Sequence, residues 1–154
     1  MRESVGSTWT IQAVIFFILI FSAFLSLVIQ YSKAYIIKNE VLTILEKYEG
    51  AESTKTIIGD YVRNQGYKTR GACPQEPDWY GAVDYDVYEK AVSGKKYYYC
   101  IKKNSLKTSK KNKYKYYYNV VFFYKFNLPI FGELHTYRVV GETKAFPGAN
   151  KTII

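Results

Sequence analysis

The sequence contains few of the residues that build catalytic and metal sites. Its 154 residues include one histidine, His135, and two cysteines, Cys73 and Cys100. The Gly-x-x-x-x-Gly-Lys-Ser/Thr, Gly-x-Ser-x-Gly and His-Glu-x-x-His motifs are absent. His135 stands in an expected strand with no acid or nucleophile at a known catalytic spacing, and one histidine with two distant cysteines does not make a zinc site. We therefore expect no enzymatic activity, metal or cofactor.

Charge is missing from the beginning of the chain. Between Glu3 and Lys33 there is no Asp, Glu, Lys, Arg or His, and residues 11–29 are apolar apart from one glutamine and two serines. A helix needs about 20 such residues to cross a bilayer core. We expect residues 1–30 to form a short cytoplasmic head and the transmembrane helix of a single-pass cell-membrane protein. A cleaved signal peptide is the alternative, but its apolar core would be shorter.

Proline and glycine are both absent between Gly6 and Gly50. Beyond the apolar run the helical period continues, and one apolar stripe consists of Ile37, Val41, Ile44, Leu45 and Tyr48. The sequence thus predicts one helix of about 40 residues, roughly 60 Å long, with Gly50 as its C-cap. Its second half, the stem helix 31–50, is expected to pack within an extracytoplasmic domain that comprises residues 31–154.

After Gly50 the pattern changes from helix to strand. Ser53 can begin a short second helix that ends near Gln65. Strands are predicted at 95–103, 113–126 and 134–146, with a weaker one at 82–90. In the strand 113–126 the even-numbered residues form an aromatic and apolar face, namely Tyr114, Tyr116, Tyr118, Val120, Phe122, Tyr124 and Phe126.

The order of these elements predicts an α+β fold. We expect a long N-terminal transmembrane-plus-stem helix, a short second helix and then an antiparallel β-sheet of three or four strands between about 82 and 146. Segregated helices and strands of this kind pack with the helix laid against one face of the sheet.

Acidic residues are missing between Lys90 and Gly132, a stretch that contains eleven lysines. Seven of them are candidate contacts to a polyanion: Lys102, Lys103, Lys107, Lys110, Lys111, Lys113 and Lys115. Lysines interleaved with tyrosines can neutralise phosphates and stack bases, and the net charge of +9 also suggests an anionic neighbour. The same pattern arises when a strand buries its Tyr face and solvates its Lys face, which we favour. An anionic cell-surface polymer is the intermediate case, and nucleic acid is the less favoured partner.

The two cysteines are expected to lie in an oxidising compartment. Cys73 precedes the sheet and Cys100 lies in its first hairpin strand, so a disulfide would fasten the preceding loop to the sheet. The alternative is a pair of buried free thiols.

Five carboxylates follow Cys73 within a short stretch: Glu76, Asp78, Asp84, Asp86 and Glu89. Such a cluster could bind Ca²⁺, but it lacks the spacing of an EF-hand loop. We favour a solvated acidic face.

The layout of the chain resembles that of pilin-like proteins. A short polar head that includes Gly6 is followed at once by an apolar helix, its amphipathic continuation and a small β-domain. Among these proteins it is most similar to the TadE-like minor pseudopilins of tight-adherence (Flp-type) pili, which have Arg-Gly-x-x-x-x-Glu-Phe before the helix. Here Arg2 and Gly6 are separated, and Ile11 with Gln12 stands where those proteins have the glutamate.

This resemblance implies a structural or assembly subunit of a bacterial pilus or secretion system. It would be cleaved between Gly6 and Ser7, and its N-terminal helix would pack with other pilin-like subunits or an assembly platform. The alternative function is a membrane-tethered binding module that uses the basic hairpin.

Overall fold

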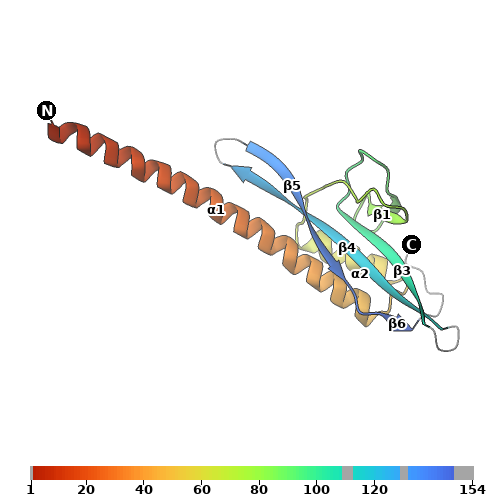
Figure 1. Cartoon of the computed structure of the whole chain (residues 1–154). Helices are drawn as coiled ribbons and strands as arrows, with labels where there is room; N and C mark the ends of the chain where they lie inside the picture. The colour runs from red at the N-terminus through yellow and green to blue at the C-terminus, as the bar shows by residue number, and fades with distance from the viewer. Residues whose placement is uncertain (1, 109–112, 129–131, 148–154) are drawn as a thin grey trace.

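The computed structural model describes residues 2–108, 113–128 and 132–147. Its dominant element is the helix α1 (Arg2–Lys47), which extends well beyond the folded domain at its N-terminal end (Figure 1). The short helix α2 (Thr54–Asn64) follows. The strands are β1 (Trp79–Ala82), β2 (Tyr88–Lys90), β3 (Tyr99–Thr108), β4 (Lys113–Leu128), β5 (Gly132–Glu142) and β6 (Phe146–Pro147). The predicted α+β order of a long helix, a short helix and a sheet is therefore confirmed.

All strands belong to one antiparallel sheet in the order β2-β1-β3-β4-β5, with β6 also paired to β4. The sheet has more strands than the three or four that the sequence suggested. The single weak strand expected at 82–90 is two short antiparallel strands, β1 and β2, because the chain reverses between them. Phe146 and Pro147 form β6 where β4 extends beyond the end of β5.

The connection between the strands predicted at 95–103 and 113–126 is also shorter than the nine residues left between them. β3 continues to Thr108, and its last residues pair in register with β4, from Asn104 opposite Tyr117 to Thr108 opposite Lys113. Backbone hydrogen bonds to a long neighbouring strand are available whatever the side chains are, so polar residues remain in the strand.

α1 packs its C-terminal half against one face of this sheet. Ile37, Val41, Ile44 and Leu45 are buried there, as the stripe predicted. They contact a core that also contains Tyr118, Val120 and Phe122 of β4, Tyr99 and Ile101 of β3, and Ile58 and Val62 of α2. Tyr48, also assigned to the stripe, is 38% exposed, because α1 ends one residue before it.

The end of α1 is held close to the sheet at Gly50. This residue has φ +66°, and a Cβ on it would lie 2.6 Å from the ring of Tyr118. Only glycine meets both requirements without strain. α1 ends at Lys47, three residues before Gly50, so the helix stops close to the predicted position.

A second core lies on the opposite face of the sheet. It consists of Cys73, Trp79, Tyr97, Cys100, Val121 and Phe123. The middle of β4 is thus buried on both faces, with the even-numbered residues toward α1 and Val121 and Phe123 toward the disulfide layer. The aromatic even face is confirmed for Tyr118, Val120 and Phe122.

Candidate functional site

The N-terminal part of α1 is covered with exposed apolar side chains. Among the described residues one helical stretch, 8–47, is long and apolar enough to cross a bilayer, and only 6% of its most apolar window is buried. This low burial separates it from the core helix of a globular domain. The exposed residues are Trp9, Ile11, Val14, Ile15, Phe16, Phe17, Ile18, Ile20, Phe21, Phe24, Leu25, Val28 and Ile29. The expectation of a candidate membrane span is confirmed.

Gly6 and Ser7, the expected processing site, lie within the first turns of α1. Their backbone is helical, and their side chains are outside the described part of the structure. Cleavage between them therefore stays a prediction.

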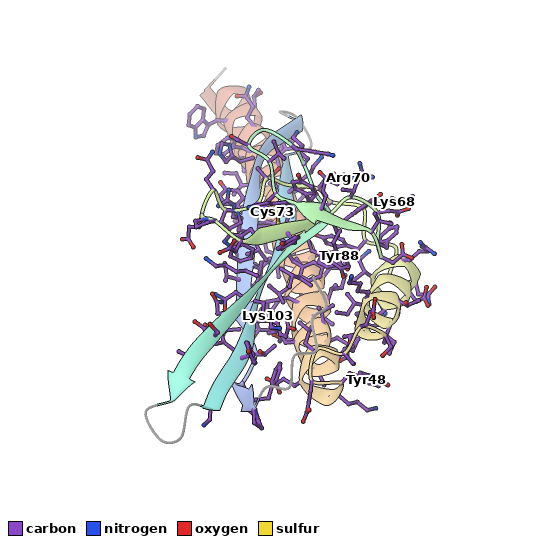
Figure 2. All side chains as sticks on the ribbon, turned by 90° about the vertical axis from the view of Figure 1, so that its right-hand side faces the viewer. Tyr48, Lys68, Arg70, Cys73, Tyr88 and Lys103 are labelled. Carbon is purple, nitrogen blue, oxygen red and sulfur yellow. A yellow bond between two sulfur atoms is a disulfide. The ribbon has the colours of Figure 1, made fainter. Side chains whose placement is uncertain are left out.

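Cys73 and Cys100 form a disulfide, as expected, with a Cα–Cα distance of 5.8 Å. The bond joins the loop before β1 to the beginning of β3 and lies in the second core beside Trp79 and Tyr97. Figure 2 shows Cys73 next to the short strands at one end of the hairpin formed by β3 and β4. The disulfide fixes the loop over one face of the sheet, and this loop completes the second core.

The described lysines of the basic hairpin do not gather on a single face. Lys102 pairs with Glu76 at 3.2 Å and lies 6.0 Å from the Trp79 ring, on the disulfide side. Its neighbour Lys103 lies on the other face, where its Nζ is 4.4 Å from the centroid of Tyr116 and burial lowers its pKa (Figure 2). Adjacent residues of a strand point to opposite faces, so the strand itself separates these two charges.

The structure describes the other candidate lysines only in part. Lys115 is exposed and pairs with Leu106 across the hairpin. Lys107 and Lys113 are in register with Tyr114 and Thr108, but their side chains lie outside the described part. Lys110 and Lys111 lie wholly outside the described residues. A polyanion contact at the hairpin end therefore stays a prediction.

The carboxylates of the acidic stretch have separate partners. Glu76 pairs with Lys102, Asp86 with Arg63 at 3.9 Å and Glu89 with Lys95 at 2.6 Å. Hydrogen bonds from Lys95 and Tyr97 lower the pKa of Glu89. Asp84 accepts a hydrogen bond from the N–H of Tyr85. These contacts disperse the carboxylates over the surface and do not focus them on one point.

A tyrosine–arginine stack near α2 was not foreseen from the sequence. The rings of Tyr85 and Tyr98 stack with centroids 4.4 Å apart, Arg63 lies over Tyr85 at 5.3 Å and Arg70 over Tyr98 at 4.1 Å. Tyr98 Oη also accepts a hydrogen bond from Arg70 at 2.6 Å. The stack joins the loop after α2 to the loop between β1 and β2. The run Tyr97-Tyr-Tyr99 signals it only weakly, because the partners are far apart in sequence.

His135 lies exposed on β5, with its ring 5.8 Å from that of Tyr137. It belongs to an aromatic row that continues through Tyr124 to Tyr31 on α1. His135 therefore stands beside aromatic rings at the surface where the β4–β5 hairpin meets α1.

The fold and these surfaces define a class of protein: a disulfide-bonded α+β domain built on a single long helix whose N-terminal part is a candidate membrane span. Comparisons of the chain with protein-family models, curated proteins and solved structures found no match in any of the three.

Proposed function

We propose that this chain is a pilin-like structural or assembly subunit of a bacterial pilus or secretion system. It is anchored in the cell membrane by α1, and its α+β domain is extracytoplasmic. The observation that carries the proposal is the continuity of α1 from Arg2 to Lys47. The same helix is apolar and exposed in its first half and forms one wall of the domain core in its second half.

This continuity favours an assembly subunit over a tethered binder. A binding module gains reach from a flexible linker, whereas a rigid stem fixes the position of its domain relative to the span. Ala23 and Ala34 are only 8% and 1% exposed, so α1 is already covered on one side before the apolar run ends, and no uncovered linker separates that run from the domain. The disulfide supports the extracytoplasmic placement, because such bonds persist in oxidising compartments.

The proposed mechanism is physical. In the bilayer, lipid covers the exposed side chains of α1. If the subunit leaves the bilayer, each large apolar side chain exposed to water costs about 1.5–3 kcal/mol, so neighbouring helices must replace the lipid. Extraction of α1 is therefore coupled to packing against other subunits or an assembly platform.

The test is the N-terminus and location of the mature protein. In cells that express the assembly machinery, the protein is expected to begin at Ser7 and to appear in the sheared surface fraction. Gly6→Leu should block cleavage, whereas Val5→Leu, which places the same side chain one residue earlier, should not. An intact Met1 together with absence from surface filaments and assembly complexes argues against the proposal.

The second candidate function is a membrane-tethered module that binds a polyanion. The observation that favours it is the run of eleven lysines without an acidic residue, in which Lys115 is exposed. Counterion release makes such binding fall steeply with salt.

A charge-matched pair of variants tests this candidate. Changing Lys107, Lys110, Lys111 and Lys113 together to serine is expected to abolish binding to wall teichoic acid or single-stranded DNA at low salt. Changing Lys47, Lys55, Lys68 and Lys144, which lie outside the run of eleven lysines, to serine removes the same charge and should weaken binding much less. Equal binding by the hairpin variant and the unaltered chain would reject this function.

A further inference from the structure

The β4–β5 hairpin runs along α1 toward the N-terminus of the helix (Figure 1). At one end, a Cβ on Gly50 would meet the Tyr118 ring at 2.6 Å. At the other, the Tyr124 ring contacts the Tyr31 ring edge-on, with centroids 5.5 Å apart. As β4 advances from Tyr118 to Tyr124, its contact thus moves back from residue 50, just beyond the end of α1, to residue 31 on the helix. The strand and the helix are antiparallel, and the hairpin end is directed toward the candidate span.

The covered side of α1 continues into the apolar run. Ala23 is 8% exposed, although the side chains on most of the helix around it are open. From Tyr31 to Ala23 the helix rises about 12 Å at 1.5 Å per residue. From Tyr124 to Leu128, β4 extends about 13 Å at 3.3 Å per residue. The backbone at the hairpin end is therefore level with Ala23.

The hairpin end therefore lies beside a part of α1 that the bilayer must cover. Residues 11–29 form about 28 Å of helix, which is close to the roughly 30 Å hydrocarbon core. Where the structure describes the side chains, the part of α1 that is exposed on all sides is residues 8–18, about 16 Å long. If α1 spans with its apolar run in lipid, the segment from Ala23 to Ile29 lies in the outer leaflet, and the hairpin end lies beside it.

A shift of the span toward the N-terminus would lift the hairpin clear of the bilayer, but it is costly. It would place Thr8 and Thr10 in hydrocarbon. It would also leave Phe24, Val28 and Ile29, which are exposed on α1, in water. Each large apolar side chain in water costs about 1.5–3 kcal/mol. Hydrophobic matching therefore favours the deeper position.

The hairpin has the chemistry of a membrane interface at this level. Tyr35, Tyr31, Tyr124 and Tyr137 form a row in that order, with distances of 6.0 Å, 5.5 Å and 5.4 Å between the centroids of successive rings. Tyr31, Tyr35 and Tyr137 are each 44% exposed. Aromatic residues of this kind gather at the headgroup level of bilayers.

Cations accompany this tyrosine row. Lys33 on α1 lies two residues from both Tyr31 and Tyr35. Lys125 on β4 and Arg138 on β5 directly follow Tyr124 and Tyr137, so they project from the opposite face of the hairpin at the same level, where they can meet lipid phosphates. Toward the hairpin end, β4 continues with Phe126 and Leu128. Asn127 and Glu133, which pair in register there, add an amide and a carboxylate, so the composition becomes more apolar in the direction of the bilayer without losing every polar group.

We propose that the β4–β5 hairpin is a second membrane contact, with the end of β4 at Leu128 and the start of β5 at Gly132 in the outer leaflet beside α1 and the tyrosine row at the level of the lipid headgroups. This inference rests on membrane anchoring by α1, which is part of the proposed function. β5 is an edge of the sheet, so its outward backbone groups need partners from water or headgroups, and these limit the depth of insertion. The domain is consequently seated on the bilayer at a fixed tilt.

Photocrosslinking to lipid in the full-length chain tests the proposal. p-Benzoylphenylalanine is placed singly at Phe16, Tyr137 or Tyr48, all of which are exposed, and each variant is reconstituted into phosphatidylcholine–phosphatidylglycerol nanodiscs. Adducts are then measured by mass spectrometry. The expected result is lipid adducts at positions 16 and 137, with at least tenfold less at position 48. A variant at Tyr35 provides a second position in the tyrosine row if the variant at 137 does not fold.

The outcomes distinguish failure of the membrane anchor from failure of the hairpin contact. Labelling at 16 with labelling at both 137 and 35 no higher than at 48 overturns the hairpin contact and leaves the anchor intact. Lack of labelling at 16 as well overturns both the anchor and the hairpin contact. Labelling at 48 as strong as at 137 shows that lipid reaches the far end of the stem, which also contradicts the proposed seating.

Discussion

The hydroxyl of Tyr67 substitutes for a missing strand neighbour. β3 begins at Tyr99 opposite Phe122, so the next residue of β4, Phe123, has no partner on that side. Tyr67 Oη donates a hydrogen bond to the carbonyl of Phe123 and accepts one from its N–H at 2.8 Å. One buried phenol thereby satisfies both backbone groups of a core residue.

Tyr67→Phe is expected to lower the free energy of unfolding by about 1–3 kcal/mol, because it leaves a buried N–H and C=O without partners. Urea unfolding in detergent measures the loss. Tyr48→Phe is the matched control, because the Tyr48 side chain is exposed and removal of its hydroxyl leaves no buried group without a partner. This substitution should change the free energy of unfolding by less than about 0.5 kcal/mol. Equal effects of the two substitutions would contradict the role given to Tyr67.

At the scale of elements, the disulfide and the loop before β1 act as one cover over the sheet. The loop approaches β4 so closely that a Cβ on Gly71 would lie 2.3 Å from the Phe123 ring. Gly71 also forms an isolated antiparallel bridge with Tyr97, with hydrogen bonds of 2.9 Å and 2.8 Å. The second core therefore depends on a segment that has little regular structure of its own.

Replacing Cys73 and Cys100 together by alanine is expected to lower stability by about 3 kcal/mol, mainly because a 27-residue separation is no longer closed in the unfolded chain. Denaturant midpoints with and without reductant measure this. Reductant should destabilise the unaltered chain and leave the double variant unchanged. A double variant as stable as the oxidised chain would show that the disulfide contributes little to the cover.

At the scale of the whole molecule, the buried tyrosines are expected to lower the free energy of unfolding at alkaline pH. Burial raises the pKa of Tyr67, Tyr88 and Tyr99 well above the usual value. The folded state favours the neutral form of these phenols. Their contribution to the free energy of unfolding is therefore fully present below about pH 10, where the tyrosines of the unfolded chain are protonated as well. It is lost as pH rises above that value, because only the unfolded tyrosines ionise freely.

The unfolding midpoint is therefore expected to fall between about pH 10 and pH 12, and absorbance at the tyrosinate band should rise in the same transition. Tyr67→Phe should make the decline shallower, because one of the responsible groups is removed. A midpoint that stays constant over this interval would contradict the prediction.

The long elements were predictable because their patterns are local. The apolar run 11–29, the stripe from Ile37 to Leu45 and the alternation along 113–126 each repeat within one segment, at the period of the element that they form. The short strands β1 and β2 were not separated, because a strand of three or four residues carries too little periodicity. Their existence depends on pairing with each other and with β3.

The sequence by itself determined the apolar run of the candidate span, the helical stem and the aromatic strand, since each follows from residue types at short spacing. Only the tertiary structure decided that both faces of β4 are buried, that Lys102 and Lys103 diverge, and that the β4–β5 hairpin runs back along α1 toward the span. Each of these features is a contact between segments that are distant in the chain. Such contacts depend on strand register and on helix packing, which the local sequence pattern does not determine.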